Sequence, residues 1–356
     1  MKSKLLILLS SMLMITILAI GCSNKVNKND TIIVEEVTPI LPEKPVIGLE
    51  TYLPIIKDTV WEYTGNQYDE NSTVWIDFIK ENVFQIRIES NLTIMAKVYI
   101  EEDGAIYEVA TIEDARIKQD YTNFRQYKQA VLKLPIEEGQ SWIIEEGITR
   151  TITEIDMQIE TAIGTMKAIE VTTEGDSFIK KDYYGEKTGL VKTVYKDNEG
   201  KSTQELSSFE TSKPVEQQIR VYLGNGYTSK LMYTDQKIPV RTNEEPKHFL
   251  TDVLKKVPSE EYALAIPKSA LIESIYLDEE TKKLYLDMSK EYYDMNYGSG
   301  MESLAVQSLV TTVGAYYDVK QVVLTVAGEP YQTGHIAYKI GESIPIKFED
   351  INEIVR

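Results

Sequence analysis

Residues 284–326 decide the fold of the second half of the chain, and they read LYLDMSKEYYDMNYGSGMESLAVQSLVTTVGAYYDVKQVVLTV. The runs 284–288 and 321–326 have the length and apolar content of strands. Between them, apolar residues recur at helical spacing, at Val306, Leu309, Val310 and Val313. A strand, a helix and a strand in succession bury their apolar faces by packing the helix on a sheet, so we expect an α+β domain.

The elements around this stretch extend the same pattern over residues 215–346. Strands are predicted at 219–223 and near 231–233, a helix from Pro246 to Pro258, and a hairpin that joins 272–278 to 284–288 across 279–282. Ser299 and Glu302 have the spacing of a capping box at the start of the second helix. The predicted order is β-β-α-β-β-α-β, in one compact domain.

The first half of the chain, residues 49–212, shows the two-residue period of strands. Alternating runs occur at 84–88, 142–145, 167–171 and 190–195, and acidic or glycine-containing turns lie between them. This pattern predicts an antiparallel all-β domain. The polar stretch 112–130 fits either a helix or a long connection. Trp61, Trp75 and Trp142 occupy positions expected in the core of this domain.

Composition excludes several classes of protein. The 356 residues include 56 Asp and Glu against 38 Lys and Arg, a formal charge of −18. So acidic a chain lacks the basic surface with which nucleic-acid-binding proteins neutralise phosphates. One cysteine cannot form an internal disulfide, and two distant histidines cannot make a thiolate or multi-histidine zinc site. We therefore expect no nucleic-acid partner, no metal and no cofactor.

The amino terminus has the layout of a secretory signal peptide. Residues 1–4 are cationic, residues 5–20 are almost wholly apolar, and the chain turns polar directly after Cys22. A small residue before the only cysteine resembles a bacterial lipoprotein signal, which implies cleavage after residue 21 and lipidation of Cys22. The alternative is an uncleaved transmembrane anchor. Cleavage would remove two lysines and no acid, leaving a formal charge of −20.

A tether is predicted between the lipidated cysteine and the first domain. Residues 22–48 show no amphipathic period and contain Pro39, Pro42 and Pro45, which favours a semi-extended linker. The mature protein is therefore expected outside the cytoplasm, anchored to the outer face of the cell membrane. Two acyl chains and an amide-linked chain would hold it more firmly than one chain would.

A resemblance to a known family rests on several motifs of the second domain. They are Ile266-Pro267-Lys268-Ser269, the hairpin of Ile275-Tyr276-Leu277 and the segment Leu284 to Glu291, the helix 299–317, the strand start 319–322, the turn 326–330 and Gly334-His335. Together they resemble the GerMN family, the sporulation and spore-germination domain of lipoproteins in spore-forming bacteria. The resemblance covers residues 218–345 and implies a fold like that of ring-building domains, used for protein contacts. The protein for which the family is named carries two copies, whereas this chain carries one.

Three acids near the hairpin raise the possibility of a glycosidase, because two carboxylates can act as acid and base. They are Asp287, Glu291 and Asp294. In a chain with 56 acids such groupings are unavoidable, and Asp287 alternates with apolar neighbours as a solvated strand residue does. A hydrogen-bonded structural role is expected for His335. The run 197–200 is expected to be a hairpin turn, because it lacks the ligand spacing of an EF-hand loop.

Paired tyrosines are a further candidate for binding. The pairs are Tyr183-Tyr184, Tyr292-Tyr293 and Tyr316-Tyr317, and in each pair one ring is expected to point inward and the other to be available to solvent. Exposed tyrosines suit protein interfaces and also sugar stacking. The simpler interpretation is that half-buried strands favour tyrosine.

These observations favour a non-enzymatic, membrane-anchored lipoprotein of the cell envelope. Its GerMN-like domain is expected to contact envelope or sporulation proteins during sporulation or germination. One alternative is a binding module for peptidoglycan or another wall glycan. A second alternative is a wall-modifying hydrolase. Apart from lipidation at Cys22, the sequence identifies no catalytic, metal-binding or partner-binding residue.

Overall fold

The computed structural model describes residues 47–66, 71–346 and 351–354. The predicted signal peptide, Cys22 and the tether up to residue 46 lie outside the described residues. From residue 46 onward the chain forms one compact unit. No helix in the described part of the chain is both long enough and apolar enough to cross a bilayer.

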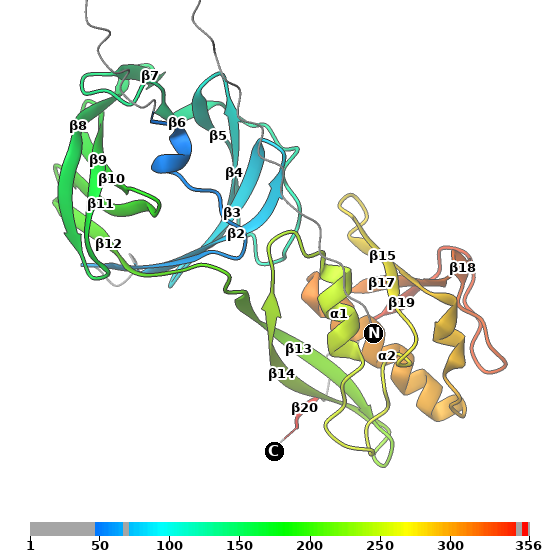
Figure 1. Ribbon diagram of the computed structural model, residues 1–356. Coiled ribbons are helices and arrows are strands. Elements are labelled where there is room, and N and C mark those ends of the chain that lie inside the picture. Colours follow the sequence, from blue (N-terminus) through cyan, green and yellow to red (C-terminus); the bar gives the residue numbers. More distant parts are fainter. Residues whose placement is uncertain (1–46, 67–70, 347–350, 355–356) are drawn as a thin grey trace, which may run out of the picture. The chain divides into compact units, whose positions relative to one another are not determined.

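The first part of this unit is a single curved sheet of 12 strands, every neighbouring pair antiparallel (Figure 1). The strands are β1 (Val60–Gly65), β2 (Ser72–Lys80), β3 (Val83–Ser90), β4 (Ile94–Glu102), β5 (Ala105–Glu113), β6 (Gln129–Lys133), β7 (Ser141–Glu145), β8 (Ile148–Thr161), β9 (Gly164–Glu174), β10 (Phe178–Gly185), β11 (Gly189–Asp197) and β12 (Lys201–Glu210). The four alternating runs lie in β3, β7, β9 and β11, so the predicted all-β character is confirmed. Residues 114–128 form a connection without a helix or strand.

The concave side of the curved sheet is filled by apolar side chains. A short 3-10 helix, η1 (Leu49–Thr51), lies inside the curve (Figure 1). Leu49 and Tyr52 are 2% and 1% exposed, and they belong to one core cluster with Trp142 and residues of β3, β5, β6 and β8 to β10. Trp61 and Trp75 are also buried, so all three tryptophans are core residues as predicted.

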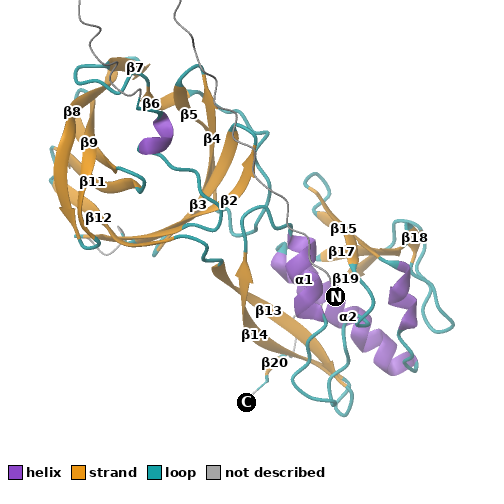
Figure 2. Cartoon of the chain, in the orientation of Figure 1, coloured by secondary structure: helices purple, strands orange, loops and turns teal. Residues whose placement is uncertain are grey.

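The second part combines helices with two smaller sheets (Figure 2). Its elements are β13 (Val215–Asn225), β14 (Lys230–Val240), α1 (Pro246–Leu254), β15 (Ile272–Asp278), β16 (Lys283–Met288), the 3-10 helix η3 (Lys290–Asp294), α2 (Ser299–Tyr316), β17 (Gln321–Val326), β18 (Glu329–Pro330), β19 (Ser343–Pro345) and β20 (Asn352–Glu353). One sheet has the order β13-β14-β20, and the other has β15-β16-β17-β18 with β19 also pairing with β17. The predicted α+β class is therefore confirmed.

One hydrophobic core joins these sheets and helices. The residues predicted at helical spacing, Val306, Leu309, Val310 and Val313, are at most 1% exposed and contact the strands through this core. The helix α1 begins at Pro246 as predicted, but it ends at Leu254, before the predicted limit at Pro258. Cross-strand pairing of Asp278 with Lys283 confirms the predicted hairpin.

The predicted capping box is wrong. Helix α2 begins at Ser299, its N-cap is Gly298, and no side chain caps it. Ser299 is therefore one position too far along the helix, and Glu302 lies beyond the third helical residue that a capping box uses. Glu302 is instead buried, at 4% exposure, and takes part in the site described below.

Candidate functional site

Asp287 and Asp294, two of the three acids of the hairpin region, accept hydrogen bonds from different residues. Asp287 accepts hydrogen bonds from Thr325 Oγ1 at 2.6 Å and from the Gly328 amide at 3.0 Å. Asp294 accepts one from Ser269 Oγ at 3.1 Å. Among the described residues, no hydrogen bond joins any two of these acids, and no group of His, Cys, Asp and Glu has a metal-binding arrangement.

Both histidines lie at exposed positions. His335 is exposed, and its backbone amide donates to Thr333 Oγ1 at 3.1 Å. The predicted structural role of its ring is wrong, because the loop 332–337 directs the ring to solvent and only the backbone is bonded. His248 is exposed on α1. The run 197–200 forms a hairpin turn, closed by a hydrogen bond from the Asp197 amide to the Gly200 carbonyl.

The tyrosine pairs divide as predicted in two of three cases. Tyr184 and Tyr292 are buried, at 5% and 0% exposure, while Tyr183 is half-buried and Tyr293 is 44% exposed. Tyr316 and Tyr317 are both half-buried, since both pack against the core of the α+β part. The exposed ring of Tyr293 is therefore the clearest candidate for contact with another molecule.

Tyr293 lies on a platform of aromatic rings. Its ring stacks on that of Tyr331, with centroids 5.7 Å apart and planes at 15°. The ring of Tyr292 meets the same Tyr331 edge-on, at 5.2 Å and 64°. Around it is an open hollow of about 890 Å³, here called the tyrosine depression, lined by Tyr293, Glu329, Pro330, Gln332, Thr333, Tyr338, Lys339 and Ile340.

The buried Glu302 fixes this platform from below. Its Oε1 accepts hydrogen bonds from Tyr331 Oη at 2.7 Å and from Thr333 Oγ1 at 2.6 Å. Burial, and then the bond to the carboxylate, raise the pKa of Tyr331, so its hydroxyl remains a donor at neutral pH. Two donors from the loop after β17 are thus held by one side chain of α2, which sets the position of the stacked rings.

Three further large apolar or aromatic side chains are exposed on the α+β part. Ile340, on the rim of the tyrosine depression, is 90% exposed. Tyr276 and Tyr285, paired across β15 and β16, are 64% and 37% exposed, and their ring centroids are 6.1 Å apart. The sequence indicated one exposed ring in the Tyr292-Tyr293 pair, but it did not indicate that residues 329–340 line a depression beside that ring.

A polar cluster on the curved sheet is structural. Glu108 accepts hydrogen bonds from Lys97 Nζ and Tyr127 Oη at 3.0 and 2.6 Å, and Thr111 and Tyr99 also donate to it. Burial alone would raise the pKa of Glu108, but Lys97 and the hydroxyl donors outweigh it, so the pKa lies below its ordinary value. The carboxylate stays ionised and fully engaged, which leaves it no capacity as a proton donor.

Within the α+β part, the chain matches a known protein family. Residues 220–332 match the Germane family, described as sporulation and spore germination. The chain contains a Germane domain. The match includes helix α2, the platform rings and the beginning of the tyrosine depression, and it agrees with the resemblance expected from the sequence. Among curated proteins, none matches the chain.

Several solved structures are similar to parts of the chain. An exported protein with a YmcC-like fold from Bacteroides fragilis has 10% identity and a TM-score of 0.30, covering 45% of this chain and 99% of its own. The first GerMN domain of the sporulation protein GerM from Bacillus subtilis has 15% identity and a TM-score of 0.27, covering 38% and 99%. A protein described as a lipoprotein from Clostridium perfringens has 16% identity and a TM-score of 0.24, covering 38% and 93%. At these scores the similarities establish no function for this chain.

Proposed function

We propose that the chain is a non-enzymatic lipoprotein of the cell envelope whose Germane domain docks against protein partners in spore-envelope assembly or germination. The observation that carries this proposal is the match of residues 220–332 to a family described by sporulation and spore germination. Lipidation at Cys22 would hold the protein on the outer face of the membrane, outside the cytoplasm.

The tyrosine depression supports docking of a protein in particular. Aromatic residues are enriched in the buried centre of protein interfaces, and polar residues surround them. Tyr293 and Ile340 supply exposed apolar area, while Glu329 and Lys339 stand beside them. Tyr293 is held by stacking, so little conformational freedom would be lost when a partner covers its ring.

The state of the acids supports a role without catalysis. Asp287 accepts hydrogen bonds from Thr325 of β17 and from Gly328 in the turn after β17, and Asp294 accepts one from Ser269. A glycosidase needs two carboxyl groups that face one substrate, whereas Asp287 and Asp294 each bond a separate partner distant in sequence.

Binding of the purified chain to two materials tests the proposal. The materials are a detergent extract of membrane proteins from sporulating cells and purified wall sacculi. We expect retention of the chain on the extract, and loss of that retention in Ile340→Ser. Ile143→Ser is the matched control, because Ile143 is 75% exposed on β7, outside the Germane domain. Retention on sacculi alone would contradict the proposal and favour a glycan-binding module.

The anchor is tested separately. In intact cells a Cys22→Ala variant should leave the membrane fraction and appear in the soluble fraction, because it lacks the acylation site. If this variant stays with the membrane as firmly as the unaltered chain, the lipoprotein assignment is wrong.

A further inference from the structure

Strand β2 has an edge that its neighbour β1 does not cover. Strand β1 pairs with β2 from Tyr63–Ser72 to Val60–Trp75, and Val60 is the first residue of β1. Strand β2 continues to Lys80, paired with β3 on its other side. The backbone groups of residues 76–80 on the β1 side therefore need partners from elsewhere, because unpaired amides and carbonyls at a strand edge are costly when buried.

A four-residue segment of the second part supplies these partners. Residues 241–244, here called the clasp, connect β14 to α1. Thr242 Oγ1 donates to the Ile76 carbonyl at 2.9 Å, and the Asn243 amide donates to the Asp77 carbonyl at 2.8 Å. In return, the Ile79 amide donates to Asn243 Oδ1 at 2.7 Å. The clasp thus occupies the place along β2 that a continued β1 would fill.

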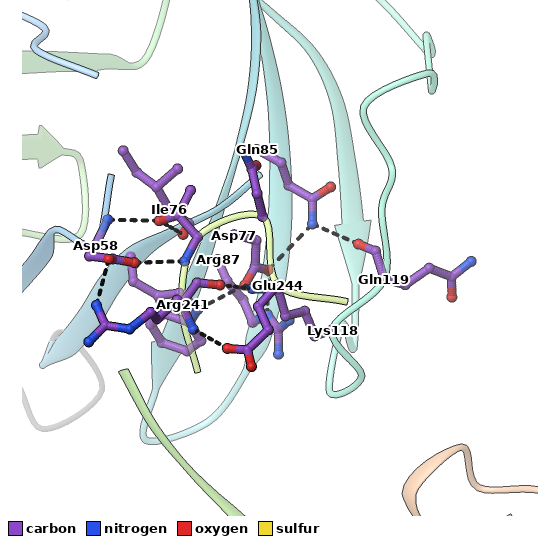
Figure 3. A network of polar contacts seen from close by, with 12 residues as sticks. Asp58, Ile76, Asp77, Gln85, Arg87, Lys118, Gln119, Arg241 and Glu244 are labelled. Carbon is purple, nitrogen blue, oxygen red and sulfur yellow. Dashed lines mark hydrogen bonds and ion pairs between the residues drawn. The ribbon is translucent and has the colours of Figure 1, made fainter. Parts of the chain in front are cut away.

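Asp58 holds the clasp from the other side (Figure 3). This residue precedes β1 and has a positive φ of 53°, so the chain turns away there and leaves the edge of β2 open. Its carboxylate accepts hydrogen bonds from the Thr242 amide and from Arg241 Nη1, both at 2.8 Å. Its own amide donates to Thr242 Oγ1 at 2.8 Å. Thr242 therefore both donates and accepts within one closed ring of contacts.

A buried group of charges lies behind the clasp (Figure 3). Asp77, Arg87 and Lys118 are 0%, 1% and 1% exposed. Arg87 Nε contacts Asp77 Oδ2 at 2.8 Å, and Lys118 Nζ lies 4.0 Å from Asp77 Oδ1 and donates to the Arg241 carbonyl. Burial lowers the pKa of Lys118 to about 8, with the charge of Asp77 acting against that shift. Since Lys118 bonds the clasp directly, the charge group and the clasp form one structure.

A second contact joins the segment between β5 and β6, which contains Lys118, to helix α2. The Lys118 amide donates to Tyr316 Oη at 3.0 Å, although 198 positions separate the two residues in sequence. The ring of Tyr316 packs edge-on against Phe249 of α1, with centroids 5.7 Å apart. Both helices of the Germane domain are thereby linked to the segment between β5 and β6.

We infer that the clasp attaches the Germane domain rigidly to the curved sheet, so that the two parts unfold as one cooperative unit. The inference gives the all-β part a role that is independent of any partner of the Germane domain. Flexible attachment would need no buried charges and no strand-edge bonds at the junction. These contacts are specific to one register, since both Thr242 and Asn243 must meet particular backbone atoms of β2.

Unfolding of the curved sheet and unfolding of the Germane domain can be followed separately by two intrinsic spectroscopic signals. All three tryptophans lie in the curved sheet, and both α-helices of the described residues lie in the Germane domain. Tryptophan fluorescence therefore follows unfolding of the sheet, and the helical signal in far-ultraviolet circular dichroism follows the Germane domain. If the two parts unfold together, the fluorescence and circular dichroism unfolding curves of the full chain in urea must coincide. Two separate transitions in the unaltered chain would overturn the inference.

The variant Thr242→Val tests the clasp itself. Valine keeps the shape of threonine but removes the hydroxyl, so the Ile76 carbonyl and the Asp58 amide both lose a partner. We expect the circular dichroism midpoint to move to lower urea than the fluorescence midpoint. The control is Thr165→Val, at an exposed position of β9, which should keep one shared midpoint. Identical behaviour of the two variants would contradict a fastening role for the clasp.

Discussion

Replacement of Asp77 by Asn should destabilise the folded chain far more than its small change in shape suggests. Asparagine keeps the volume of the side chain but removes the one negative charge between two buried cations, Arg87 and Lys118. Removing one partner of a buried ion pair costs about 3–5 kcal/mol, because the remaining charge is left without compensation. Since folded domains are stable by only about 5–15 kcal/mol, this is a large fraction of the total.

The assay is urea unfolding of the full chain, followed by tryptophan fluorescence and circular dichroism. At about 2–3 °C per kcal/mol, the melting temperature should also fall by roughly 6–15 °C. Asp235→Asn is the matched control, because Asp235 also pairs with an arginine, Arg220, at 2.9 and 3.0 Å, but at the surface. Exposed pairs contribute about 0–1 kcal/mol. Equal losses in the two variants would refute the reasoning.

A second substitution should partly rescue the first. In Asp77→Asn with Lys118→Met, only Arg87 remains as a buried cation, so the combined variant should be more stable than Asp77→Asn alone. Residues in one buried network couple by about 0.5–3 kcal/mol, and here the coupling should be favourable. Simple addition of the two single effects would show that Lys118 and Asp77 do not interact.

Three further predictions concern Lys118, the bond between Tyr331 and Glu302, and Thr242. The folded pKa of Lys118 is about 8 against an ordinary 10.5, so the folded state binds fewer protons than the unfolded state between these values. The quantity to measure is the free energy of unfolding of the unaltered chain minus that of Lys118→Met. This difference should rise as the pH increases from about 8 to 10.5, by up to about 1.4 kcal/mol per pH unit. A flat or falling difference would contradict the lowered pKa of Lys118. Tyr331→Phe removes one of two donors to the buried Glu302 and should cost about 1–3 kcal/mol in urea unfolding, whereas Tyr293→Phe, at an exposed ring, should cost less than about 0.5 kcal/mol. Thr242→Val should cost about 2–3 kcal/mol by circular dichroism, and a loss below 0.5 kcal/mol, roughly that of a surface substitution, would speak against the clasp.

The elements of the fold could be predicted from local sequence because their apolar periods are strong. The stripe from Val306 to Val313 specifies a helix, and alternation at 84–88 specifies a strand, whatever surrounds them. The exact start of α2 could not be predicted, because Gly298 and Ser299 are both acceptable near a helix start. Glu302 is buried and bonds Tyr331 and Thr333, about 30 residues later, and local sequence does not show these contacts.

The junction could not be predicted, because its contacts connect distant positions. Thr242 and Asp58 are 184 positions apart, and the clasp reads as an ordinary polar turn. Lys118 lies in a polar stretch that gave no structural signal, yet its side chain is 1% exposed. Because β1 begins only at Val60, the edge that these residues fill is left open, and the start of a strand is a property of the assembled sheet.

The tyrosine depression was partly predictable. The Tyr292-Tyr293 pair indicated one buried and one exposed ring, since adjacent residues at a strand end or turn point in different directions. The platform beneath Tyr293 depends on Tyr331, which meets it only in the folded domain. The sequence therefore indicated that one ring of the pair is exposed, but not which ring it is or the surface to which it belongs.

Site-specific photo-crosslinking in intact sporulating cells tests the central claim most directly. A crosslinking amino acid is placed at Ile340, on the rim of the tyrosine depression, or at Ile143, on β7. Both side chains are exposed, at 90% and 75%, so both positions should tolerate the change. The proposed docking function predicts a discrete protein adduct from position 340 and none from position 143. Equal adducts from both positions, or none from position 340 throughout sporulation and germination, would contradict it.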